Sequence, residues 1–235
     1  MDKAIRRIVD KALDGGEITP AEIRRLFGVH YLSEESFLTQ YASRKMSEIT
    51  SKGKAEVHGQ VGVDLGPCPK NCEYCSFAEK NKIFRVPKIH PLAEIVEKCT
   101  AFEAAGANAV YLMATAAVAL RDFLRIAKEV RASLKPETPL IANIDDFDED
   151  GAKALKKAGI VGIYHCVRLG EGAVTAIEPR VRIRTIRAAQ KAGLLWGTSV
   201  GPVGPEHTLD ELAETTVLTS SPRRAKSADR MEGAM

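Results

Sequence analysis

The sequence lacks the segments that direct a chain to or through a membrane. Its first residues alternate charged and apolar side chains, without the short apolar core of a secretory leader. No uninterrupted apolar run approaches the roughly 18 residues that a membrane-spanning helix needs. We therefore expect a cytoplasmic protein with no membrane partner.

An excess of charge of one sign is also missing. The chain has 34 Lys and Arg residues against 31 Asp and Glu residues, a formal net charge of +3 that is spread along its length. This balance does not favour a nucleic-acid partner, because such a partner requires a concentrated basic surface. With 235 residues, 45% of them hydrophobic, the chain can form one catalytic domain with appendages.

Cysteine is scarce but clustered. The chain has five cysteines, and three of them, Cys68, Cys72 and Cys75, fall in the stretch GPCPKNCEYCSF at residues 66–77. In a reducing compartment such a cluster binds metal more readily than it forms disulfides. The spacing C-x3-C-x2-C lets three thiolates reach adjacent corners of an iron–sulfur cubane, with no fourth cysteine close by. The remaining iron would then be open to a substrate or cofactor.

Two other metal sites fit the same residues in part. A structural zinc site would need a fourth ligand, which His58 or His90 could supply, but the usual paired Cys-x2-Cys knuckles are missing. A ferredoxin-like electron carrier would need a fourth cysteine. The open cubane therefore remains the leading hypothesis.

The pattern of apolar residues divides the chain into three parts. Residues 1–50 are expected to form helices only, with a cap at Thr19 and another at Ser33. Residues 51–218 alternate short β-rich runs with amphipathic helices, and residues 219–235 lose the apolar period and are predicted to be disordered. The sharp change of composition after Leu218 is what a fragment or a shifted reading frame would produce.

The middle part is predicted to be a parallel α/β sheet. Three of its expected helices end in Ala-Gly just before a strand, which places a glycine where a left-handed cap is required. Functional groups gather at the carboxyl ends of such strands, and the cysteines directly follow the first one. The expected strands are Val57–Leu65, Ala109–Met113, Pro139–Ile144, Val161–Val167 and Leu194–Val200, and the expected helices cover about residues 91–105, 121–134, 149–158 and 180–192.

The cysteine motif, with aromatic Tyr74 before the last cysteine, resembles the signature of the radical S-adenosylmethionine (SAM) superfamily. The stretches AGIVGIYHCVRLGEG, VRIRTIRAAQKAGL and SVGPVGPEHTLDE further resemble the biotin synthase-like branch, which includes hydrogenase maturase and methylornithine synthase enzymes. The resemblance covers about residues 30–215. It implies a partial (β/α) barrel of the TIM type with an N-terminal helical extension.

The resemblance also implies a chemistry. A [4Fe-4S] cluster on Cys68, Cys72 and Cys75 would bind SAM and cleave it reductively to a 5′-deoxyadenosyl radical, which abstracts hydrogen from a small metabolite or cofactor precursor. Reduced flavodoxin or ferredoxin would donate the electron. The strands that carry the second-cluster cysteines of biotin synthase have none here, so we expect modification of a small carbon skeleton rather than sulfur insertion. The rival hypothesis is a noncatalytic, truncated iron–sulfur remnant.

The same resemblance suggests cofactor-binding residues. It places Tyr74 near the SAM adenine, Thr115 near its amino group, and Arg168 with Glu171 near its carboxylate and ribose. Asn143, at the end of the third strand, would face the cavity. Each has a plainer alternative: Tyr74 as a packing residue, Thr115 as a cap, Asn143 as a turn former, and Arg168 with Glu171 as a surface ion pair.

Overall fold

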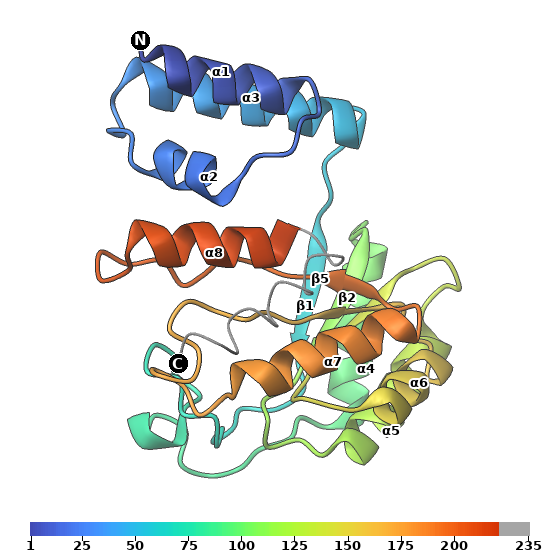
Figure 1. Cartoon of the computed structure of the whole chain (residues 1–235). Helices are drawn as coiled ribbons and strands as arrows, with labels where there is room; N and C mark the ends of the chain where they lie inside the picture. Colours follow the sequence, from blue (N-terminus) through green and yellow to red (C-terminus); the bar gives the residue numbers. More distant parts are fainter. Residues whose placement is uncertain (221–235) are drawn as a thin grey trace. The chain divides into compact units, whose positions relative to one another are not determined.

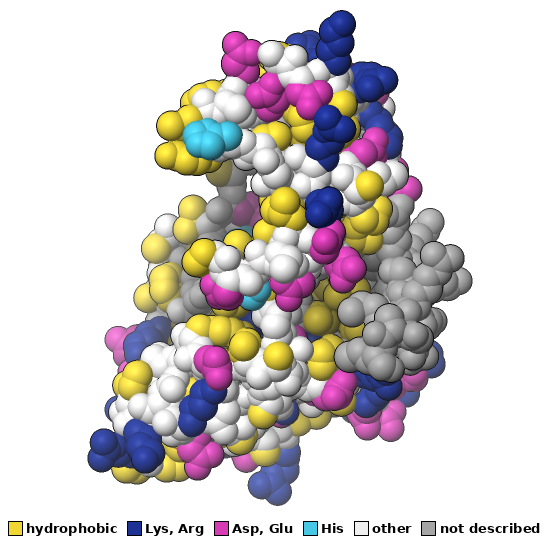
Figure 2. All heavy atoms as spheres, turned by 60° about the vertical axis from the view of Figure 1, so that its left-hand side comes forward, with side chains coloured by type: hydrophobic (Ala, Val, Ile, Leu, Met, Phe, Trp, Pro, Cys, Tyr) yellow, Lys and Arg dark blue, Asp and Glu magenta, His cyan; other side chains and the backbone are white. Residues whose placement is uncertain are grey.

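The computed structural model describes residues 1–220, which separate into two compact units. One unit comprises residues 56–199, and the other comprises residues 1–55 together with the chain from Val200 onward. Among the described helices, none has the length and apolar character required to cross a membrane. On the face drawn in Figure 2, basic and acidic side chains are interspersed, in keeping with the balanced composition.

The unit of residues 56–199 is built on a parallel sheet with helical crossovers (Figure 1). The five strands lie in chain order, β1-β2-β3-β4-β5. A doubly wound sheet reverses its strand order at a switch point, whereas an unreversed order forms the wall of a barrel. The elements are β1 (His58–Gly62), a 3₁₀ turn η1 (Glu79–Asn81), α4 (Leu92–Ala104), β2 (Ala109–Met113), α5 (Leu120–Ser133), β3 (Leu140–Asn143), α6 (Glu149–Lys157), β4 (Gly162–Tyr164), α7 (Pro179–Lys191) and β5 (Leu195–Gly197).

The core of this unit lies between the sheet and its helices. Val110 and Leu112 of β2 have no exposed surface, and Phe123 of α5 is equally buried in the same cluster. On α4, Ile95 and Cys99 are fully buried. Phe102, three residues further along, is 39% exposed because its ring lies over Gly59 of the edge strand β1.

The glycines of the three Ala-Gly pairs have the left-handed conformation that the sequence predicts. Gly106, Gly159 and Gly193 have φ values of +86°, +89° and +73°, in the left-handed region that glycine adopts without steric cost. Each follows a helix and precedes β2, β4 or β5. A left-handed glycine therefore ends three of the crossover helices and turns the chain back toward the sheet.

The second unit is helical. It contains α1 (Lys3–Leu13), α2 (Pro20–Phe27), α3 (Glu34–Ser51) and α8 (Leu209–Ser220). Thr19 and Glu22 form the predicted capping box at the start of α2, and α2 packs against α8, where Arg24 pairs with Asp210 at 2.6 Å. The sequence predicted disorder from residue 219, but Thr219 and Ser220 belong to α8. The rest of the predicted tail, residues 221–235, lies outside the described residues.

Candidate functional site

A cavity of about 310 Å³ opens at the carboxyl ends of the strands in the unit of residues 56–199. All three clustered cysteines line it, together with residues that follow β2, β3 and β4. Segments far apart in the sequence thus converge, as the edge of a parallel sheet requires. Of the predicted site residues, the lining includes Cys68, Cys72, Cys75, Thr115, Asn143 and Arg168, and it does not include Tyr74 or Glu171.

The cysteine loop is held in shape by its own backbone. Cys68 N donates to Phe77 O at 2.7 Å, and Glu79 N donates to Cys68 O at 3.1 Å. These two hydrogen bonds hold the ends of the loop together. Within the loop, Cys75 N donates to Cys72 O at 3.0 Å. Gly66 enters the loop with φ +80°, a conformation that a side chain would strain. The thiols are thereby presented from one rigid turn.

The three thiols are partly exposed and form no disulfide. Burial raises the pKa of the Cys72 thiol, while the nearby Arg168 guanidinium opposes that rise. Among residues 1–220, no three His, Cys, Asp or Glu side chains lie close enough to hold one metal ion. A cubane is ligated at separate corners, so its thiolates stand farther apart than the ligands of a single ion.

The two histidines considered as a fourth zinc ligand are absent from the lining of the cavity. His58 Nε2 lies 3.0 Å from Glu56, and its ring stacks on Tyr111. His90 Nδ1 lies 3.4 Å from Glu94. No histidine of the described chain lines the cavity, and its two carboxylates are engaged elsewhere, Asp64 by Thr115 and Gly66 and Asp145 by Lys70. The three thiols therefore fit an open-cornered cluster better than a closed zinc site.

Asp64 is a site residue that the sequence analysis missed. Its buried carboxylate accepts hydrogen bonds from Thr115 N at 2.8 Å, from Thr115 Oγ1 at 2.6 Å and from Gly66 N at 3.0 Å. It thus joins the start of the cysteine loop to the end of β2. The sequence did contain a signal for Asp64: it is an acidic residue within an apolar run, and a buried carboxylate is uncommon unless it has a partner.

Thr115 and Asn143 line the cavity from adjacent strand ends. The Thr115 hydroxyl donates to Asp64 and accepts from Ala117 N at 3.2 Å, so it is engaged in organising the turn. Asn143 O accepts from Ala114 N at 2.8 Å, which extends the β2–β3 ladder to the cavity rim. No hydrogen bond of the Asn143 side chain is found among the described residues.

Arg168 and Glu171 do not form a surface ion pair. The Glu171 side chain is only 1% exposed, and its carboxylate accepts from Arg168 N at 3.0 Å and from Thr175 Oγ1 at 2.8 Å. The Arg168 guanidinium lies 3.5 Å from the same carboxylate and lines the cavity. Glu171 therefore shapes the loop after β4 and orients Arg168.

Tyr74 lies within the cysteine loop, directly before Cys75, and is 45% exposed. Partial burial raises the pKa of its hydroxyl, and contact with the Cys72 thiol raises it further. This position is close to the cluster cysteines but outside the lining of the cavity. The contact of Tyr74 with the SAM adenine stays a prediction.

A buried polar network of Arg182, His165 and Asp146 lies behind the cavity, and the sequence analysis did not predict it. Arg182 lines the cavity, and its side chain is 7% exposed. Its Nη1 donates to His165 Nε2 at 2.5 Å, and its Nε lies 3.5 Å from Asp146. Burial lowers the pKa of His165, so this ring is neutral and can accept from the guanidinium. Lys70 of the cysteine loop pairs with Asp145 at 3.0 Å on the same side.

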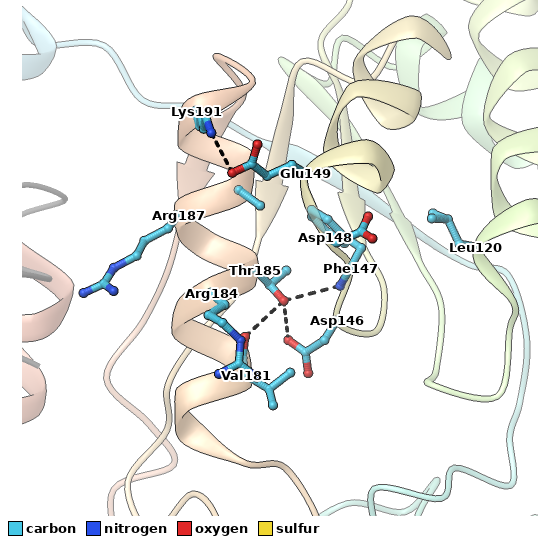
Figure 3. A pocket seen from close by; sticks show the side chains of 11 residues that line it. Leu120, Asp146, Phe147, Asp148, Glu149, Val181, Arg184, Thr185, Arg187 and Lys191 are labelled. Carbon is cyan, nitrogen blue, oxygen red and sulfur yellow. Dashed lines mark hydrogen bonds and ion pairs between the residues drawn. The ribbon is translucent and has the colours of Figure 1, made fainter. Parts of the chain in front are cut away.

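A larger cavity, of about 760 Å³, lies between α6 and α7 (Figure 3). Thr185 donates to Asp146 at 2.9 Å on its wall, and Lys191 pairs with Glu149 at 2.7 Å at its far end. It contains no cysteine, and its acidic and basic side chains are mixed. The smaller cavity at the strand ends is therefore the candidate site, because the three clustered cysteines line it.

Comparison with known proteins bears on this cavity directly. Residues 66–218, which begin at the cysteine loop and run to the last described helix, match the model of the radical SAM superfamily. The chain belongs to this superfamily. The recognition made from the cysteine spacing is confirmed.

Curated relatives of this radical SAM protein include two biotin synthases. The one from Carboxydothermus hydrogenoformans is 27% identical over 206 residues, which cover 83% of this chain and 62% of the relative. The one from a Nocardioides species is 26% identical over 205 residues, covering 83% and 54%. The chain thus spans between about half and six tenths of the length of these relatives.

Solved structures support the fold. The crystal structure of HydG, a maturase of the [FeFe]-hydrogenase, superposes with a TM-score of 0.74 at 17% identity, covering 94% of this chain and 52% of HydG. Methylornithine synthase PylB gives 0.72 at 18% identity, covering 90% and 62%. The expected partial barrel of parallel strands with an N-terminal helical region is therefore confirmed.

Proposed function

We propose that Cys68, Cys72 and Cys75 hold a [4Fe-4S] cluster and that the adjoining cavity binds SAM, which the protein cleaves reductively. The observation that carries this proposal is the convergence of the three thiols with residues from three other strand ends in one cavity. When bound, the cluster and SAM supply a 5′-deoxyadenosyl radical that abstracts hydrogen from a C–H bond. The protein's own residues bind, orient and shield these groups.

The cavity suits a ligand with an amino acid end. Its volume of about 310 Å³ is at the lower end of the usual range of about 300–1,000 Å³ for small-molecule sites. The Arg168 guanidinium, oriented by Glu171, can bind a carboxylate through two parallel hydrogen bonds. Asn143 offers an amide at the end of β3, and backbone groups near Thr115 offer further polar partners.

The substrate is proposed to be a small metabolite or cofactor precursor whose carbon skeleton is modified. The strand ends after β2, β3 and β5 carry no cysteine, so a second, sulfur-donating cluster has no ligand set there. The lining instead brings the cations Lys70, Arg168 and Arg182 around one cavity. The same lining includes Asp64 and Asp145, and each of the three cations faces a carboxylate, so the cavity suits a polar ligand rather than a strongly anionic one.

Anaerobic reconstitution tests the proposal. The wild-type chain should bind about four irons, as a cubane requires, and should release 5′-deoxyadenosine from SAM only when dithionite is present. Cys72→Ala should lose most of the iron and all SAM cleavage. Cys99→Ala is the matched control, since Cys99 is a buried core residue of α4, and should retain both. Iron binding without SAM cleavage would support the noncatalytic remnant, and zinc binding in place of iron would support the structural site; either result contradicts the proposal.

A further inference from the structure

The segment that follows the cysteine loop, residues 79–89, is basic and exposed. It carries Lys80, Lys82, Arg85 and Lys88 against one carboxylate, Glu79. Every residue of this basic segment is exposed except Phe84, and the apolar side chains Ile83, Val86 and Ile89 are 62%, 76% and 54% exposed. A chain with nearly balanced charge thus gathers four cations and three exposed aliphatic residues in one stretch.

Most of these cations have no internal partner. Lys80 pairs with Glu73 at 3.2 Å, and Arg85 Nε donates to a backbone oxygen, that of Lys82. Within residues 1–220, no carboxylate forms an ion pair with Lys82, Arg85 or Lys88. Their charge is therefore available to a partner.

The basic segment is anchored to the cysteine loop. Lys80 N donates to Asn71 Oδ1 at 2.8 Å, and Asn81 Nδ2 donates to Cys75 O at 2.8 Å. At its other end, Leu65 N donates to Lys88 O at 2.9 Å, next to the start of the loop. The segment, teal in Figure 1, therefore lies against the candidate cluster site at both ends.

An aromatic pair links the basic segment to the cavity. Phe84, its one partly buried residue, stacks on Phe77 with ring centroids 5.1 Å apart and an interplanar angle of 21°. Phe77 lines the cavity with the three cysteines. The Phe77–Phe84 pair thus connects the basic segment directly to the wall of the cavity.

We infer that the basic segment is the docking surface for an acidic one-electron donor protein of the flavodoxin or ferredoxin class. This inference rests on the proposed function, which needs one electron to enter at the cysteine loop. In each encounter the donor is oxidised by one electron and the cluster on the three cysteines is reduced by one. Exposed cations attract an acidic partner as it approaches, and the apolar side chains between them exclude water once the two proteins are in contact.

Charge reversal with a matched control tests the inference. The triple variant K82E/R85E/K88E is compared with R125E/K128E/K157E, which makes the same charge change at exposed residues of α5 and α6. Binding of oxidised flavodoxin to the reconstituted proteins is measured by biolayer interferometry at low and high salt. We expect the first variant to bind at least about tenfold more weakly at low salt and to lose the salt dependence, and the control to remain within about twofold of wild type.

A second readout separates this inference from the proposed function. Dithionite is a small reductant and needs no docking surface, so K82E/R85E/K88E should retain dithionite-driven SAM cleavage while losing flavodoxin-driven cleavage. Failure of dithionite-driven cleavage in the wild type would contradict the proposed function. Unchanged flavodoxin affinity in a folded K82E/R85E/K88E variant would overturn the docking surface. Loss of binding to phosphatidylserine vesicles in that variant, with flavodoxin binding unchanged, would likewise overturn it and assign the segment to a membrane.

Discussion

Replacing Asp64 by Asn should destabilise the unit of residues 56–199 by about 3 kcal/mol. The Asp64 carboxylate accepts three hydrogen bonds in a buried position, and such bonds to a charged group contribute about 1.5–3 kcal/mol each. The carboxamide of Asn has one acceptor oxygen and no charge. It can keep the two bonds now made by Oδ2, in weaker form, but its NH₂ group then faces the backbone N–H of Thr115.

Urea denaturation followed by Trp196 fluorescence measures this change. Trp196 is the only tryptophan, and it lies on β5 with its indole N–H donating to His165 O at 2.7 Å, so its emission reports on this unit. With a urea m-value of about 2–3 kcal/mol/M, a loss of about 3 kcal/mol lowers the unfolding midpoint by about 1–1.5 M.

The control is Asp150→Asn, which removes an exposed carboxylate that pairs with Lys153 at 2.9 Å on the surface of α6. Exposed pairs of this kind contribute little, so its midpoint should not shift measurably. If Asp64→Asn and Asp150→Asn unfold at the same urea concentration as wild type, the reasoning that Asp64 anchors the cysteine loop is refuted.

Three further predictions concern the core and its buried charges. Burial lowers the pKa of His165 below the usual value of 6.5, so the unfolded chain binds this proton more readily than the folded chain. The resulting stabilisation is present above pH 6.5 and is lost as the pH falls through the lower pKa of the folded state. His165→Gln should therefore flatten the loss of stability at acid pH in urea titrations. Gly59→Ala should lower the melting temperature because a Cβ there would collide with the Phe102 ring, and adding Phe102→Ala should recover part of the loss; purely additive effects would contradict the contact. Phe123→Ala should cost about 3–5 kcal/mol in unfolding free energy, since the ring has no exposed surface; a cost below about 1 kcal/mol would show that the site collapses around the deletion.

The crossover architecture could be predicted from the sequence because its signals are local. The change from helical to β-rich periodicity placed all five strands to within a few residues, and β2 was placed without error at Ala109–Met113. The first strand was predicted as Val57–Leu65 but is regular only over His58–Gly62, because after Val63, whose N–H still donates to Met113 O at 2.8 Å, the chain leaves β2 to begin the cysteine loop. Strand propensity does not reveal the residue at which the strand ends and the loop begins.

The candidate site was predictable only in part. The three cysteines follow from spacing, and the sheet then brings Thr115, Asn143 and Arg168 to their cavity. The assignments of these residues to SAM remain predictions. Tyr74 and Glu171 were grouped with them by resemblance, yet the structure places both outside the lining, since which side of a loop faces a cavity depends on what packs behind it.

The sequence by itself determined three clustered thiols with no fourth cysteine close by, the alternation of strand and helix, and the Ala-Gly pairs that end three crossover helices. Each depends on residues that are close together in the chain. Only the tertiary structure decided that Asp64 holds Thr115, 51 residues away, and that Arg182 meets His165 and Asp146 behind the cavity. Buried polar groups take whichever partners the packed fold brings to them, and spacing along the chain does not encode that choice.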